Sequence, residues 1–175
     1  MNIYLIGFMG SGKSTAGRKI AAALHWHFLD LDYVAVDQQG LTIPEMFRLH
    51  GESFFRNAET KALHDISSRS KTVIACGGGT PCSETNMEIM KRTGIVVYLK
   101  MTAPALVSRL VSSKNKRPLL EEAGEGGITA KVESLLNVRT PWYEQADIIT
   151  DGLNIDTGEI TELLAARIRD AGAFL

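Results

Sequence analysis

Short apolar runs alternate with amphipathic stretches along the whole chain. Runs that suit buried strands lie at residues 3–6, 28–30, 72–76, 95–99 and 147–150. Apolar residues at helical spacing mark the stretches between them, at 14–24, 54–66, 84–92, 103–113, 128–145 and 158–170. This alternation predicts a three-layer α/β/α fold with a five-stranded parallel sheet, in a single domain over residues 1–175. Right-handed crossovers would bring the carboxyl ends of all strands to one edge, where ligands are expected.

The first apolar run leads directly into a glycine-rich motif. The sequence Gly7-Phe8-Met9-Gly10-Ser11-Gly12-Lys13-Ser14 fits G-x-x-x-x-G-K-S/T. A helix that begins at about Lys13 would place its positive end, together with the N–H groups of the turn, around one anion-binding concavity. Lys13 can then reach the β- and γ-phosphates of a nucleotide, and the Ser14 hydroxyl can ligate Mg²⁺. We predict that the chain binds a nucleoside triphosphate.

Composition and charge limit the other classes of partner. The chain has 175 residues, of which 45% are hydrophobic, and this is enough for the core of one domain. Its formal net charge of −1 gives no electrostatic case for nucleic acid or a membrane surface. The longest apolar run, 95–99, is too short to span a bilayer. Lys13 is the first cation, so no secretory signal is expected, and Cys76 and Cys82 fit reduced thiols in a cytoplasmic protein.

Two pairs of charged residues are candidates for chemistry. Asp30 and Asp32 lie at the end of the second strand, and in an extended segment both carboxylates would face one side. One carboxylate could then lie near Mg²⁺ and the other near an acceptor hydroxyl, as phosphoryl transfer requires. Alternatively, one is a helix N-cap and the other a solvated acid. Arg56 and Glu59 share one helix face, either as a surface salt bridge or as a guanidinium that Glu59 aims at a substrate carboxylate.

Two further segments suit close contact with a ligand. Gly77-Gly78-Gly79 follows the third strand and would let a ligand approach the backbone. Residues 114–127 are charged and glycine-rich, as in a solvated loop, but their place at the expected nucleotide edge and the arginine before Pro118 favour a mobile lid at about 112–127. Arg109 and Arg139 lie on expected helices and indicate no role by themselves.

Six motifs together resemble the shikimate kinase family over nearly the whole chain. In order they are G-F-M-G-S-G-K-S-T at 7–15, D-L-D at 30–32, F-R-x-x-E at 55–59, G-G-G at 77–79, R-P-L-L at 117–120 and R-x-P-x-Y at 139–143. The resemblance implies ATP-dependent phosphorylation of the 3-hydroxyl of shikimate, on the route to chorismate and the aromatic amino acids. It also implies a P-loop kinase fold like that of the nucleoside monophosphate kinases, with a substrate-binding helical segment at about 32–62 and a closing lid. A monomer is expected.

The resemblance assigns the ATP side of the site. Ser14 would ligate Mg²⁺ directly and Asp30 would do so through water. Arg117 would close with the lid onto the transferring phosphoryl group, and Arg109 would pack against adenine. The late adenine-binding loop, near 151–156, has no readable signature. The phosphates would be held by Gly10, Ser11, Gly12, Lys13, Ser14 and Thr15.

The resemblance likewise assigns the acceptor side. Asp32 would bind the shikimate hydroxyls and could serve as the base. Arg56, oriented by Glu59, and Arg139 would clamp the substrate carboxylate. Backbone N–H groups would come from Gly78 and Gly79.

The chain departs from the family pattern near the substrate helix, and two other functions compete. Tyr33–Val36 stands where relatives often have an acid, and Phe54 precedes Phe55 where glycine is common. A GTP-binding switch is disfavoured, because Arg117-Pro118 follows Asn115-Lys116, so that the guanine-binding aspartate of an N-K-x-D motif is missing, and because the D-x-x-G at 37–40 lies in an expected helix. A gluconate or nucleotide kinase of similar fold is the closer rival, since gluconate also has a carboxylate.

Overall fold

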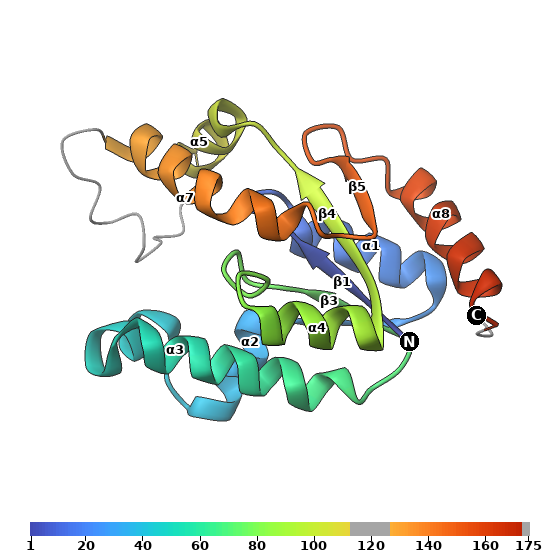
Figure 1. Ribbon diagram of the computed structural model, residues 1–175, viewed down its shortest axis with the longest axis horizontal. Coiled ribbons are helices and arrows are strands. Elements are labelled where there is room, and N and C mark those ends of the chain that lie inside the picture. The colour runs from blue at the N-terminus through green and yellow to red at the C-terminus, as the bar shows by residue number, and fades with distance from the viewer. Residues whose placement is uncertain (113–126, 173–175) are drawn as a thin grey trace.

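The computed structural model describes residues 1–112 and 127–172. Its single sheet has the order β2-β3-β1-β4-β5, and every neighbouring pair is parallel (Figure 1). The strands are β1 (Asn2–Ile6), β2 (His27–Asp30), β3 (Thr72–Ala75), β4 (Gly94–Lys100) and β5 (Ile148–Asp151). Seven helices lie in the described ranges: α1 (Lys13–Leu24), α2 (Leu31–Gln39), α3 (Ile43–Ser67), α4 (Glu84–Thr93), α5 (Ala103–Val111), α7 (Gly127–Tyr143) and α8 (Thr157–Asp170). The predicted α/β/α fold and its five parallel strands are confirmed.

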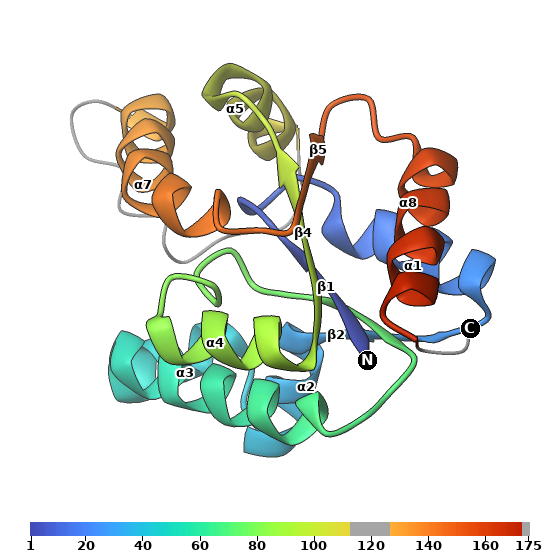
Figure 2. The same ribbon diagram turned by 45° about the vertical axis from the view of Figure 1, so that its right-hand side comes forward.

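Alternate residues of β1 define two cores, one on each face of the sheet. Ile3 and Leu5 pack in a cluster with apolar residues of α1 and α8. Tyr4 and Ile6 pack on the opposite face with residues of α2, α3, α4 and α7. Figure 2 shows α1 and α8 together on one side of the sheet and α3 and α4 on the other. The central strands β1 and β4 are buried on both faces, which explains why they read as continuous apolar runs rather than alternating ones.

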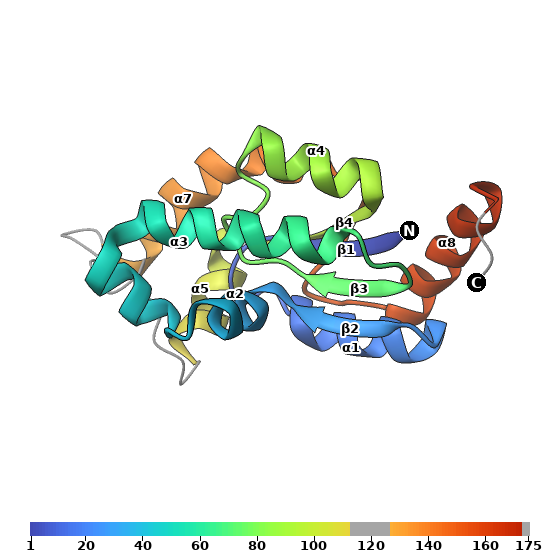
Figure 3. The same ribbon diagram turned by 90° about the horizontal axis from the view of Figure 1, so that it is seen from below.

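A helical segment between β2 and β3 extends beyond the carboxyl ends of the strands (Figure 3). It consists of α2 and of α3, which begins much earlier than the expected residue 54. Thr42 caps α3 in a capping box with Glu45, and Gly51, at φ 81°, interrupts the helix. The first part of α3 therefore stands beside the ligand edge, while the second part packs on the sheet. No helix in the described ranges is long and apolar enough to cross a membrane.

Candidate active site

The loop between β1 and α1 forms an open cradle of backbone N–H groups. Gly10 and Gly12 have φ values of 82° and 92°, which side chains disfavour, and Ser11 N donates to Phe8 O at 3.1 Å to close the turn. Gly12 is the N-cap of α1, and no side chain caps the first turn. The N–H groups at the positive end of α1 are thus available to an anion, as the motif predicts.

Lys13 and Ser14 connect this cradle to its surroundings. Lys13 is 8% exposed, and its Nζ donates to Gly7 O and Phe8 O at 2.9 Å each. Ser14 Oγ donates to Asp30 Oδ2 at 2.6 Å, which brings the phosphate loop and the end of β2 together. Two hard oxygen donors therefore adjoin the place expected for a triphosphate, and they are the ligand type that Mg²⁺ prefers.

Asp30 and Asp32 do not share an extended segment, so that expectation is wrong. β2 ends at Asp30, and Asp32 lies in the first turn of α2. Asp30 caps α2 by accepting from Asp32 N at 3.2 Å through Oδ1, while its Oδ2 faces Ser14. Asp30 can therefore be both the N-cap of α2 and a ligand of Mg²⁺, because each role uses a different carboxylate oxygen. Both carboxylates still line one cleft of about 620 Å³, together with Lys13 and Ser14.

Arg56 is held by a buried carboxylate rather than by a surface pair alone. Its Nη1 lies 2.8 Å from Glu59 Oε2, and its Nη2 lies 3.0 Å from Glu52 Oε1. Glu59 is only 1% exposed, and the buried Thr80 hydroxyl donates to its other oxygen. Burial alone would lower the pKa of Arg56, but the two carboxylates hold that pKa above its usual value. The guanidinium is therefore a fixed cation.

The glycine loop after β3 passes between Arg56 and Arg139. A Cβ on Gly79 would stand 2.5 Å from Arg56 Nη1, so a larger residue there would displace that guanidinium. A Cβ on Gly78 would stand 3.3 Å from Nη1 of Arg139, which reaches the loop from α7. Arg139 is 6% exposed, and this buried Nη1 has no hydrogen-bond partner within the described residues. An anionic ligand would supply one.

These groups surround a small hollow of about 70 Å³ that adjoins the larger cleft. Both cavities are lined by Met9, Asp32, Ile43, Gly77 and Gly78. The hollow also has an apolar wall from α3, which lies within the predicted substrate-binding segment at about 32–62, although none of its residues was named as a site residue from the sequence. Positions 43 and 47 are four residues apart and apolar, which is the helical signal that could have found them. The wall consists of Ile43, Phe47 and Phe55.

Arg109 lies on the other side of the phosphate loop. Its Nη1 donates to Gly10 O at 3.4 Å, and its Nη2 donates to Leu153 O at 3.3 Å. A Cβ on Gly12 would lie 3.5 Å from both Arg109 Nη1 and Ile155 Cδ1, so the previously unassigned loop between β5 and α8 borders the phosphate loop here. The expected lid at about 112–127 lies almost entirely outside the described residues, and so does Arg117.

The site has two connected halves at the carboxyl edge of a parallel sheet. One half is a phosphate cradle with Lys13 and Ser14, and the other is a hollow with two arginines, Arg56 and Arg139. A cradle for a triphosphate beside a cationic hollow for a second small molecule suits phosphoryl transfer between them. The fold and this site define a P-loop kinase of small molecules.

A model of the shikimate kinase family matches residues 9–169. The chain belongs to this family. The shikimate kinase of Bacteroides fragilis is 38% identical over 149 residues, which cover 85% of this chain and 83% of the relative. The solved structure of shikimate kinase from Acinetobacter baumannii in complex with shikimate is 36% identical, with a TM-score of 0.85, and the match covers 97% of this chain and 93% of that one.

A gluconokinase from Sinorhizobium meliloti has the same fold. Its solved structure gives a TM-score of 0.58 with 20% identity, over 98% of this chain and 93% of the other. At that identity the likeness extends to the fold alone. The rival substrate gluconate therefore gains no support from it.

Proposed function

We propose that this protein transfers the γ-phosphoryl group of ATP to the 3-hydroxyl of shikimate. The observation that carries the proposal is the pair Arg56 and Arg139, which flank one glycine loop beside the phosphate cradle. Membership of the shikimate kinase family, whose members use ATP as co-substrate, supports the same reaction. The complex of the Acinetobacter baumannii relative with shikimate supports this acceptor.

On the acceptor side, the two guanidinium groups bind the carboxylate of shikimate. Arg56 is held in place by Glu59, and the unpartnered Nη1 of Arg139 completes the clamp. The apolar wall of α3 covers the carbon ring, and Asp32 accepts hydrogen bonds from the hydroxyls. With the carboxylate fixed, the reacting hydroxyl is turned toward the phosphate cradle, and Asp32 accepts its proton during transfer.

On the donor side, the N–H groups of residues 10–15 and the ammonium of Lys13 hold the phosphates. Ser14 Oγ and, through water, Asp30 hold Mg²⁺, which neutralises phosphate charge when it is bound. Within the described residues no cluster of three or more His, Cys, Asp or Glu side chains could hold a metal by itself. Such a small protein ligand set suits an ion whose remaining ligands are water and ATP oxygens. Arg109 packs against adenine.

The remaining assignments concern the chain as a whole. We propose one kinase domain over residues 1–175, in which the segment 32–62 binds the acceptor. The segment at about 112–127 closes over the site and brings Arg117 to the transferring phosphoryl group. Closure excludes water, which would otherwise compete with shikimate as acceptor.

A coupled assay of ADP release tests the reaction. With Mg-ATP, we expect rapid turnover of shikimate and at most slow turnover of gluconate, because gluconate lacks the ring that the α3 wall covers. Nucleoside monophosphates serve as a further comparison, since other kinases of this fold act on nucleotides. Equal turnover of shikimate and gluconate would remove the substrate assignment.

Truncation of either arginine should weaken shikimate binding. For Arg56→Ala and Arg139→Ala we expect the free energy of shikimate binding to become less favourable by about 1.5–3 kcal/mol each, which is the contribution of a charge-assisted hydrogen bond. The affinity for ATP should change little, and both constants can be measured by calorimetry. Arg48→Ala is the matched control, because Arg48 is exposed on the first part of α3. Unchanged shikimate affinity in both site variants would refute the clamp.

A further inference from the structure

The three carbonyl groups of the glycine loop are all engaged inside the protein. Gly77 O accepts from Thr80 N at 3.2 Å, and Gly79 O accepts from Cys82 N at 3.0 Å, both within local turns. Gly78 O accepts instead from the hydroxyl of Tyr143, at 2.5 Å, and this donor comes from α7. The N–H groups of Gly78 and Gly79 make no hydrogen bond within the part of the chain that the structure describes.

We infer that Tyr143 is a positioning residue that aims the N–H group of Gly79 at the substrate carboxylate. In a trans peptide unit the C=O and the N–H point in opposite directions, and the described residues contain no cis peptide. Gly78 and Gly79 line the hollow, whereas Tyr143 is fully buried and contacts the loop from the core side. Holding Gly78 O against the core therefore turns the N–H of Gly79 into the hollow.

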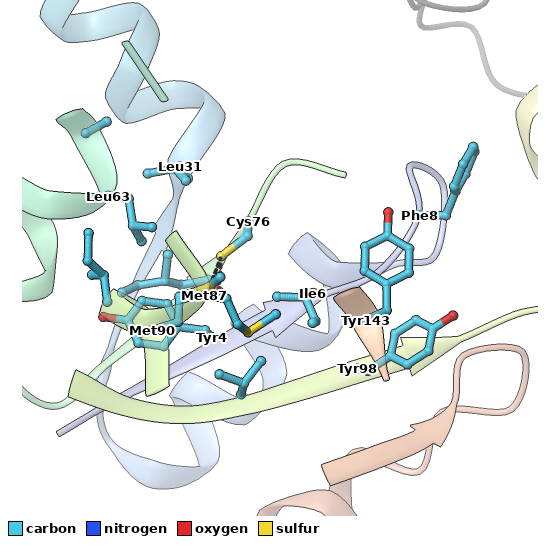
Figure 4. Close-up of a cluster of buried hydrophobic side chains, with 14 of the residues drawn as sticks. Tyr4, Ile6, Phe8, Leu31, Leu63, Cys76, Met87, Met90, Tyr98 and Tyr143 are labelled. Atoms are coloured by element: carbon cyan, nitrogen blue, oxygen red, sulfur yellow. Dashed lines mark hydrogen bonds between the residues drawn. The ribbon is translucent and has the colours of Figure 1, made fainter. Parts of the chain in front are cut away.

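A glycine loop needs such an anchor more than other loops do. Without side chains, the peptide unit between Gly78 and Gly79 has many accessible orientations, so its direction is poorly fixed by local sterics. Tyr143 is itself held firmly: its ring packs against that of Tyr98, with centroids 5.0 Å apart, and the two hydroxyl groups point in different directions (Figure 4). Burial raises the pKa of Tyr143, which keeps its hydroxyl protonated as a donor.

The anchor also links two parts of the carboxylate site. Tyr143 and Arg139 are one helical turn apart on α7, so a single rigid element places the Arg139 guanidinium and directs the Gly79 N–H. On the opposite side of the loop, Arg56 covers Gly79. A carboxylate would thus meet two cations and one oriented N–H group.

This inference rests on the proposed function, and Tyr143→Phe tests it, because that change removes only the hydroxyl. We expect the KM for shikimate to rise about tenfold, the value of one lost hydrogen bond to a charged group, while the KM for ATP stays the same. Tyr98→Phe is the matched control, since it makes the same change in the adjacent ring, and we expect no change in either KM. Thermal unfolding of each variant verifies the fold.

A second substrate separates an aimed N–H group from general loosening of the site. With an analogue of shikimate whose carboxylate is replaced by hydroxymethyl, kcat/KM should be nearly the same for Tyr143→Phe and the wild type. An unchanged KM for shikimate, an equal rise in both KM values, or a tenfold loss on the analogue would each overturn the positioning role. If the wild type does not phosphorylate shikimate, the proposed function fails together with this inference, whereas the other outcomes leave the proposed function intact.

Discussion

Replacement of Lys13 by methionine is expected to lower kcat for shikimate phosphorylation by about 10³-fold or more, as for other groups that neutralise charge in phosphoryl transfer. The ammonium lies at the phosphate cradle, where it donates to Gly7 O and Phe8 O at 2.9 Å. With ATP bound, we expect it to turn from these carbonyls to the β- and γ-phosphates, where negative charge develops on transfer. Methionine retains most of the buried stem but cannot supply the charge.

The experiment compares kcat at saturating ATP and shikimate with circular dichroism of the same samples. Lys19→Met is the matched control, because Lys19 lies exposed on the same helix, α1, and should leave kcat unchanged. A Lys13→Met enzyme that is folded and retains kcat within about tenfold would contradict the assignment of the phosphate loop.

Asp32→Asn should reduce kcat by about 10²–10⁴-fold, the range typical of a lost general base. Asparagine has nearly the same size and can still accept hydrogen bonds from shikimate, but it cannot accept a proton. Asp32 lines both the cleft and the hollow, so its carboxylate stands where the two substrates would meet. Shikimate affinity should therefore fall much less than kcat does.

Rapid-quench measurement of a single turnover isolates the transfer step from product release. Asp37→Asn serves as the control, since Asp37 is exposed on the same helix, α2. Loss of affinity with an unchanged transfer rate would give Asp32 a binding role and remove it as the base.

The positions of the charged residues in the fold, and not the net charge of the chain, explain how it can bind anions. A net charge of −1 gave no electrostatic case for nucleic acid or a membrane surface as partner. In the folded chain, however, Lys13, Arg56 and Arg139 come from three different helices to one edge of the sheet. Local concentration of cations, rather than overall basicity, is what lets a nearly neutral chain bind two anionic substrates.

Features that depend on neighbouring residues were predictable from the sequence. The phosphate loop follows from a strand, a glycine turn and a helix in succession, and the pairing of Arg56 with Glu59 follows from helical spacing. One local error concerned Asp32, which was expected in an extended segment with Asp30 but lies in the first turn of α2, because Asp30 is the N-cap of that helix. The N-terminal part of α3 also had a local signal, in Thr42 and Glu45, that the apolar pattern did not reveal.

The sequence by itself thus determined the order of strands and helices, the phosphate loop and the types of residue available for phosphoryl transfer. Only the tertiary structure decided which of them meet. The bond of Tyr143 to Gly78 joins residues 65 positions apart, and that of Thr80 to Glu59 joins residues 21 apart. Such contacts depend on how helices pack across the sheet, and spacing along the chain carries no information about that packing. The phosphate cradle can therefore be predicted from neighbouring residues. The contact of Tyr143 with the glycine loop and the hollow beside Arg56 and Arg139 form only when the elements pack together.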